Sequence, residues 1–159
     1  MAGSLEEYSG AGTAIQRPPW PLQSELELAA LPGAPASARI HVRMVACEWG
    51  LRDLAETAEL LTSELVTNAV RASERLRQRA DLAIVPVVLL WLASDRSSLV
   101  VHVWDMDDEM PVRRDAGTDD EAGRGLMLVE DLSSDWGVYW NEHGKTVWVM
   151  IGPLNDFPW

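Results

Sequence analysis

Several features that define common classes of protein are scarce in this chain or missing from it. Its 159 residues include one cysteine, Cys47, so no internal disulfide can form, which agrees with a reducing compartment. No apolar run approaches the roughly 20 residues that a membrane-spanning helix needs. The first residues also lack the basic-then-apolar order of a signal peptide. We therefore expect a cytoplasmic protein with no membrane partner.

Positive charge is scarce as well. The chain has 13 Lys and Arg against 25 Asp and Glu, which gives a formal net charge of −12. Because the backbone of a nucleic acid requires clustered cations, we expect no nucleic-acid partner. An acidic protein that binds a nucleotide must meet the phosphates locally, through backbone N–H groups, one or two cations, or a metal.

Two familiar phosphate-binding signatures are absent from the sequence. The triplet Gly144-Lys145-Thr146 lacks the upstream glycine of a Walker loop, and the residues after it predict a strand instead of a helix. No dinucleotide-binding fingerprint occurs either. The sequence therefore does not indicate either of these nucleotide-binding motifs.

What the chain does contain is the composition of one ordinary globular domain. Hydrophobic residues make up 47% and charged residues 24% of it, and its length is sufficient to bury a core. We expect residues 1–20, which are rich in Gly, Ser, Ala and Pro, to form a flexible arm. Residues 21–152 then form the folded domain, and residues 153–159 form a C-terminal tail.

The hydrophobic pattern predicts five strands and three helices. The strands are expected at residues 23–30, 84–93, 99–104, 136–140 and 146–151, and the helices at residues 37–49, 51–79 and 125–132. Ser37 is the expected N-cap of the first helix, and Gly50 its stop. Helices grouped against a mostly antiparallel sheet predict an α/β fold, a two-layer α+β sandwich with the helices on one face.

One polar residue interrupts the apolar stripe of the long second helix. The stripe consists of Leu54, Ala58, Leu61, Leu65, Ala72 and Leu76. At about 100° per residue, Asn68 lies roughly 20° from Leu61, near the middle of this stripe, and Glu64 lies about 40° from Asn68. Buried polar groups cost free energy unless they have partners. Either the protein satisfies these side chains internally, or they line a ligand pocket.

Three further polar signals stand at the ends of predicted elements. Asp105 directly follows a strand. The segment Gly123-Arg124-Gly125-Leu126 opens a helix, where glycine permits a close backbone approach to a phosphate and free N–H groups face an anion. The triplet Gly144-Lys145-Thr146 opens the last strand with a cation and a hydroxyl. Each signal alone is also explained by a turn or by packing.

Taken in this order, the four signals resemble one family. The sequence is similar to the histidine-kinase and gyrase-type ATP-binding fold (the Bergerat-type fold), and most closely to its short members, the anti-sigma-factor serine kinases and related regulatory ATPases. The resemblance spans about residues 22–152. The matching segments are residues 63–70, 103–105, 123–129, 136–137 and 144–148.

The resemblance implies roles for the two helix residues. Asn68 would coordinate the Mg²⁺ that bridges the phosphates of ATP, a hard cation that takes oxygen ligands and keeps several waters. Glu64 would be the general base that orients or deprotonates the attacking hydroxyl.

It also implies roles for the other signals. Asp105 would accept a hydrogen bond from the adenine amino group, with Thr146 beside it in the adenine pocket and Lys145 nearby. Residues 123–126 would form the lid over the phosphates, to which Arg124 adds charge.

The match to the family departs after Asp105. The family commonly has a D-x-G-x-G box there, whereas residues 105–111 (DMDDEMP) contain no glycine. The extra carboxylates either bind a metal or face solvent, and we expect them to face solvent.

The resemblance implies a serine/threonine protein kinase that phosphorylates an anti-sigma-factor antagonist and also sequesters a sigma factor, often as a homodimer. A second hypothesis is an ATP-binding regulatory module that switches partner binding without phosphotransfer. A third is a nucleotide-free interaction domain, which would leave Asn68 and Asp105 without a purpose.

Overall fold

The computed structural model describes residues 20–109 and 121–154, and for residues 121–126 it describes the backbone alone. The predicted arm up to residue 19, the predicted tail from residue 155 and the acidic stretch 110–120 lie outside the described residues.

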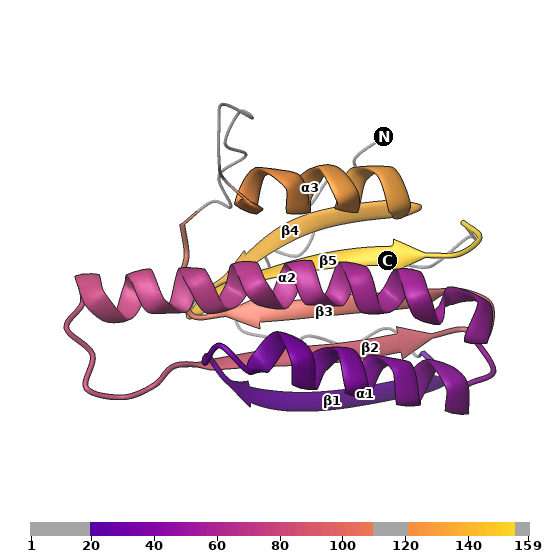
Figure 1. Ribbon diagram of the computed structural model, residues 1–159, viewed down its shortest axis with the longest axis horizontal. Helices are drawn as coiled ribbons and strands as arrows, with labels where there is room; N and C mark the ends of the chain where they lie inside the picture. The colour runs from indigo at the N-terminus through magenta and orange to yellow at the C-terminus, as the bar shows by residue number, and fades with distance from the viewer. Residues whose placement is uncertain (1–19, 110–120, 155–159) are drawn as a thin grey trace.

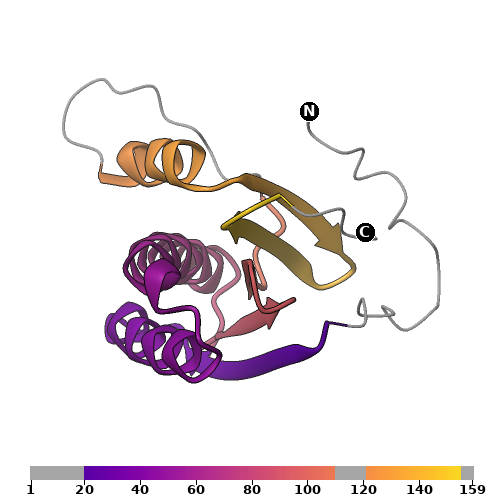
Figure 2. The same cartoon turned by 90° about the vertical axis from the view of Figure 1, so that its right-hand side faces the viewer.

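The described residues form two layers, a five-stranded sheet with three helices on one face (Figures 1 and 2). The elements are β1 (Leu22–Ala29), α1 (Ala34–Glu48), α2 (Arg52–Arg79), β2 (Val87–Ser94), β3 (Leu99–Asp105), α3 (Glu121–Leu132), β4 (Asp135–Asn141) and β5 (Gly144–Ile151). The strand order is β1-β2-β3-β5-β4, and each neighbouring pair is antiparallel. The predicted α/β fold and the predicted order of elements are confirmed.

Helix α1 begins earlier than the sequence indicated and ends where it was expected to. It starts at Ala34 with a proline in its first turn and no side-chain cap, so the expectation that Ser37 is the N-cap is wrong. Proline suits the first turn because its missing N–H would have no helical partner there. Gly50 adopts a φ of 77°, and the next amide, of Leu51, donates to Ala46 O at 2.8 Å, which closes the helix end.

The buried face of α2 is turned by roughly 40° from the predicted stripe. Its buried residues are Ala55, Ala58, Leu61, Thr62, Leu65, Val66, Ala69, Ala72 and Ser73. This face is displaced because α1 packs along one flank of α2 and covers it. Asn68 is half-buried at the edge of the face, so the expectation that it lies near the middle is wrong.

Side chains of the sheet alternate between a helix-facing core and an outer aromatic cluster. Val101 and Val103 of β3 and Val149 of β5 belong to the core beneath the helices. Val100 of β3 and Trp148 of β5 belong to the cluster on the other face. This alternation decides to which face each polar residue at a strand end belongs.

Besides the start of α1, two boundaries differ from the predicted ones by three residues or more. β2 begins at Val87 and not at residue 84, because Pro86 has no N–H to donate to a strand ladder. α3 begins at Glu121, so Gly123 and Gly125 lie inside the helix and not at its entry. Each glycine lowers helix propensity by about 1 kcal/mol relative to alanine, which is why the sequence placed the helix after them.

His41 of α1 makes the stability of this layer sensitive to pH. Its Nε2 lies 3.1 Å from Ser24 Oγ of β1, and partial burial lowers the pKa of His41 below 6.5. The unfolded chain therefore binds a proton more readily, and stability falls as pH drops below about 6.5. We expect His41→Gln to reduce the loss of melting temperature between about pH 7.5 and pH 5.5, as followed by circular dichroism.

His143, in an exposed turn, supplies the matched control for this pH dependence. His143→Gln should keep the native difference in melting temperature between the two pH values. An equal difference in the His41→Gln variant would contradict the assignment.

Candidate functional site

Asp105 and Lys145 form a buried ion pair where β3 ends and β5 begins. The register pairs them directly, and alternation from Val103 places Asp105 on the helix-facing side. Asp105 is 2% exposed and Lys145 is 4% exposed. Lys145 Nζ donates to Asp105 Oδ1 at 2.8 Å and to the main-chain oxygen of Asp107 at 2.8 Å. The buried ammonium thus has two acceptors, as a stable buried charge requires.

The environment of the Asp105 carboxylate favours an N–H donor. Burial raises the pKa of Asp105, while the Lys145 ammonium and the amide of Asp107 lower it, and the net direction is upward. The Asp107 amide donates to Asp105 Oδ1 at 2.9 Å. Because a buried carboxylate remains ionised only where donors compensate its lost hydration, this position selects donor groups.

The acidic segment after β3 is anchored to the folded domain. Asp107 is fully buried, and its Oδ1 lies 3.4 Å from an Arg79 nitrogen at the end of α2. Arg79 also pairs with Glu109, and the indole of Trp140 in β4 donates to the main-chain oxygen of Asp108 at 3.0 Å. The expectation of solvent exposure is confirmed for Asp108 and Glu109 and wrong for Asp107, because Arg79 provides a partner.

One atom of this segment has no hydrogen-bond partner. Within the described residues, Asp107 Oδ2 is buried and makes no hydrogen bond. An orphaned acceptor of this kind is costly unless a donor reaches it in another state of the protein.

Asn68 and Glu64 lie on the side of α2 that is turned away from α1. Glu59 marks the α1 side, since its carboxylate is 2.5 Å from Arg43 of α1. Asn68 lies about 180° around the helix from Glu59. Glu64 lies about 40° from Asn68, on the side away from the buried face of α2. Because α2 lies between α1 and α3 (Figure 1), both half-buried residues are on the α3 side.

The predicted lid residues belong to α3. Gly123, Arg124, Gly125 and Leu126 are in its N-terminal half, and their side chains lie outside the described residues. The α3 backbone stands on the same side of α2 as Asn68, and the lid role of residues 123–126 stays a prediction.

Thr146 does not lie beside Asp105. It pairs with Trp104, so its side chain projects from the opposite face of the sheet, and it is buried there. Lys145 occupies the position that the sequence assigned to Thr146. A shift of one residue changes the face, and continuing the alternation back from Val147 and Val149 would have found Lys145.

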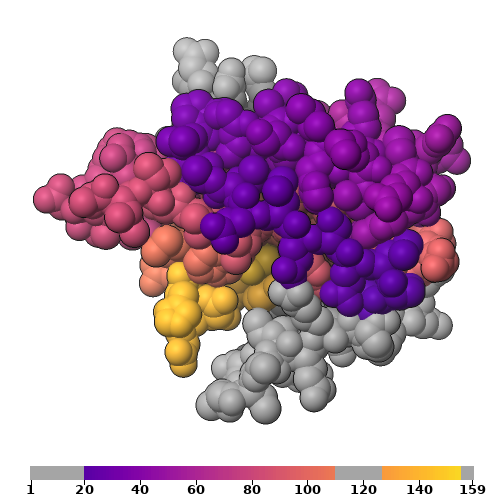
Figure 3. Space-filling view, turned by 90° about the horizontal axis from the view of Figure 1, so that it is seen from below, coloured from indigo at the N-terminus to yellow at the C-terminus, as the bar shows by residue number. Residues whose placement is uncertain are grey.

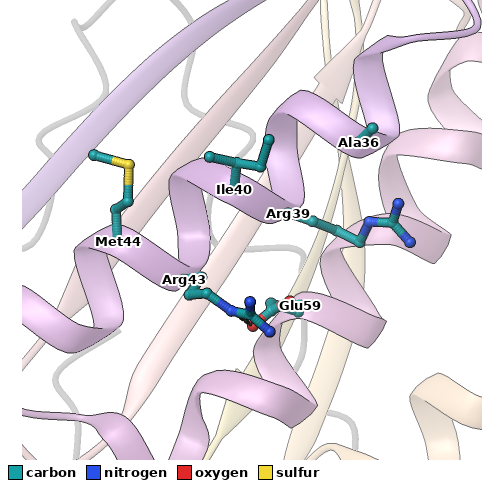
Figure 4. A pocket seen from close by; sticks show the side chains of 6 residues that line it. All are labelled: Ala36, Arg39, Ile40, Arg43, Met44 and Glu59. Atoms are coloured by element: carbon teal, nitrogen blue, oxygen red, sulfur yellow. Dashed lines mark hydrogen bonds and ion pairs between the residues drawn. The ribbon is translucent and has the colours of Figure 1, made fainter.

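A surface hollow on α1 is separate from these residues. It has a volume of about 410 Å³ and is lined by Ala36, Arg39, Ile40, Arg43, Met44 and Glu59 (Figure 4). Figure 3 views the molecule from below, where much of the surface belongs to β1 and α1. The hollow belongs to the flank of α2 opposite Asn68, so it is not part of the candidate site.

Two absences can be stated for the part of the chain that the structure describes. No group of three His, Cys, Asp or Glu side chains is placed to hold a metal ion there. No helix among the same residues combines the length and apolarity that are needed to span a bilayer.

The fold is an antiparallel sheet with its helices on one face. A family model for the histidine kinase-like ATPase domain matches residues 28–151, and the chain belongs to this family. ATP is therefore the ligand that its class implies.

A solved structure shows the same fold. The crystal structure of the RsbU and RsbW domains of Rv1364c from Mycobacterium tuberculosis is similar with a TM-score of 0.52 at 18% identity. The match covers 82% of this chain and 32% of that chain, so this chain spans about a third of it. No curated protein matches the sequence.

Proposed function

We propose that the chain binds ATP with Mg²⁺ and is a regulatory serine/threonine protein kinase. Its substrate is an anti-sigma-factor antagonist protein, and the chain also binds a sigma factor and acts as a homodimer. The observation that carries the proposal is the buried Asp105 carboxylate on the helix-facing side of the sheet. The motif resemblance and the family model support it.

Asp105 fits the recognition of adenine by its chemistry. An ionised carboxylate is an acceptor without a proton to donate, and the exocyclic amino group of adenine is a donor. Guanine has a carbonyl oxygen at that ring position, which leaves a buried carboxylate unpaired. A site built around one such hydrogen bond rejects the analogue that lacks the donor.

Asn68 fits a magnesium ion that is bound mainly by the nucleotide. It offers one amide oxygen from the α3 side of α2, and Mg²⁺ usually keeps several waters and phosphate oxygens as ligands. The backbone of α3 would act on the phosphates from the same side, and the family resemblance implies that Arg124 adds charge to the lid.

Glu64 is one helical turn from Asn68 on the same side of α2. Its carboxylate takes the proton of the substrate hydroxyl as that oxygen attacks the γ-phosphorus and ADP leaves. Phosphotransfer depends mainly on positioning and charge stabilisation, so a base and a metal ligand on one rigid helix suit the reaction.

One observation favours a second function, an ATP-dependent switch without phosphotransfer. Asp105 already holds Lys145, and three further carboxylates follow it in the chain. Like charges near the nucleotide disfavour a triphosphate, which suits reversible binding that changes partner affinity.

Calorimetric titration with ATP and GTP, each with and without Mg²⁺, tests nucleotide binding. We expect ATP to bind more tightly than GTP, and Asp105→Asn to weaken ATP by at least about tenfold and to remove the preference. Circular dichroism of the variant checks that it is folded. If native protein gives neither heat nor a thermal shift at millimolar nucleotide, both functions are excluded and the nucleotide-free interaction domain remains.

A further inference from the structure

Lys145 is the only lysine among the 159 residues, and it is buried. Lysine is almost never fully buried unless it is paired, and its 4% exposure therefore reflects a specific arrangement. The ammonium bridges the Asp105 carboxylate and the main chain of Asp107. No cation needs to be enclosed at this point for the fold alone, since an apolar pair of similar volume is often as stable.

The ammonium of Lys145 and the amino group of adenine have the same chemistry toward Asp105. Both are N–H donors, and both gain most from a carboxylate that lacks water. With 2% of Asp105 exposed, a base reaches its oxygens only after a neighbouring group has moved. Lys145 and the amide of Asp107 both donate to Asp105 Oδ1, and Lys145 is the side chain of the two that can move away.

We propose that Lys145 is an internal competitor of the nucleotide base. It holds Oδ1 of Asp105 and is displaced from that oxygen when ATP binds. The inference rests on the proposed function, because it concerns the same base site. It makes Lys145 a determinant of ATP affinity, since the ion pair must be broken before adenine is recognised.

Asp107 provides an acceptor for the displaced ammonium. Its main-chain oxygen already accepts a hydrogen bond from Lys145 at 2.8 Å. Its Oδ2 is the buried, unpartnered atom of the same residue within the described part of the chain. A movement of the lysine side chain toward Asp107 Oδ2 would satisfy that atom and release Asp105.

Lys145→Met tests the competition because methionine keeps the apolar stem and removes the ammonium. Asp105 is then buried without its main partner, which lowers the melting temperature of the free protein. Because loss of the ammonium raises the pKa of Asp105 further, ATP is titrated at about pH 8.5 to keep the carboxylate ionised. ATP then supplies the missing donor, so we expect it to bind at least about tenfold more tightly than it binds native protein at the same pH. The rise of melting temperature at saturating ATP should be larger as well.

Arg77→Gln is the matched control for the loss of one positive charge. Arg77 pairs with Glu74 at the exposed end of α2 and does not contact Lys145, Asp105 or Asp107. Its loss should not tighten ATP binding, because no competitor is removed.

A single lysine also permits a direct observation in the native chain. Protein labelled with ¹⁵N in lysine alone should give one side-chain ammonium resonance, which is visible because the buried group exchanges slowly. Saturating Mg²⁺-ATP should shift or broaden this resonance, and the same concentration of Mg²⁺ without nucleotide should not.

The outcomes separate the inference from the function on which it rests. If native protein binds ATP, the inference is overturned by an unchanged lysine resonance or by a folded Lys145→Met protein that binds no more tightly. The resonance decides alone if the variant does not fold. If neither native nor variant protein binds ATP, the proposed function is wrong. The proposed competition between Lys145 and adenine is then wrong as well.

Discussion

Gly144→Ala should lower the melting temperature by roughly 6–12 °C. A Cβ at this position would stand 2.0 Å from the main-chain oxygen of Asp105 and 3.0 Å from the Cα of Met106. Because both atoms are backbone, the clash can be relieved only by moving β5 away from β3. We estimate the cost at about 3 kcal/mol, the upper end of ordinary overpacking, and each kcal/mol lowers the midpoint by roughly 2–4 °C in a chain of this size.

Gly33→Ala is the control for this substitution. Gly33 has a φ of −78°, and a Cβ there meets nothing within 4 Å. Its melting temperature should stay within about 2 °C of the native value. Differential scanning calorimetry compares the melting temperatures of the native protein and the two variants. Equal melting temperatures for the two variants would show that stability does not depend on the close approach of Gly144 to the main chain of Asp105.

The same substitution bears on the candidate site. Gly144 allows β5 to approach the end of β3 closely enough for Lys145 to meet Asp105 across the register. If the strands separate there, the ion pair is lost together with the packing. The stability of the hairpin and the state of the base site are therefore coupled through one backbone contact.

The order and type of every described element follow from local sequence, whereas the orientation of the long helix does not. A 3.6-residue repeat shows that α2 is amphipathic, but the small or hydroxyl side chains of Ala55, Thr62 and Ser73 can face either way, and Val66 is the one strongly apolar residue beside them. They are buried because α1 packs on that flank, which is a tertiary effect. Sequence reasoning consequently placed Asn68 too near the centre of the buried face.

The orientation of a site residue can be predicted where strand alternation determines it. It cannot be predicted where it depends on a partner that is distant in the chain. Val101 and Val103 already indicate that Asp105 faces the helices. The burial of Asp107 depends on Arg79, which is 28 residues away, and no local pattern reports that pairing. The residue types predict an acidic loop exposed to solvent, but the long-range ion pair between Arg79 and Asp107 buries Asp107.

Glu64→Gln should lower phosphotransfer by at least about a hundredfold, because the amide cannot accept the proton of the attacking hydroxyl. ATP affinity should remain within about twofold of the native value, since the side chain keeps its shape. The measurement is transfer of label from γ-labelled ATP to an antagonist protein that co-purifies with the chain.

Asn68→Ala should instead weaken the Mg²⁺-dependent part of ATP binding.

Glu59→Gln shows whether the loss is specific to one face of α2. Glu59 is also a helix carboxylate, but it faces α1 and pairs with the largely exposed Arg43. A pair with one exposed partner is worth about 1 kcal/mol. Phosphotransfer should survive in this variant. Transfer that persists in Glu64→Gln would remove Glu64 as the base. If native protein binds ATP without any transfer, Asn68 and Asp105 hold a nucleotide that acts as a switch. The acidic segment after β3 is then the feature that separates this switch from a kinase.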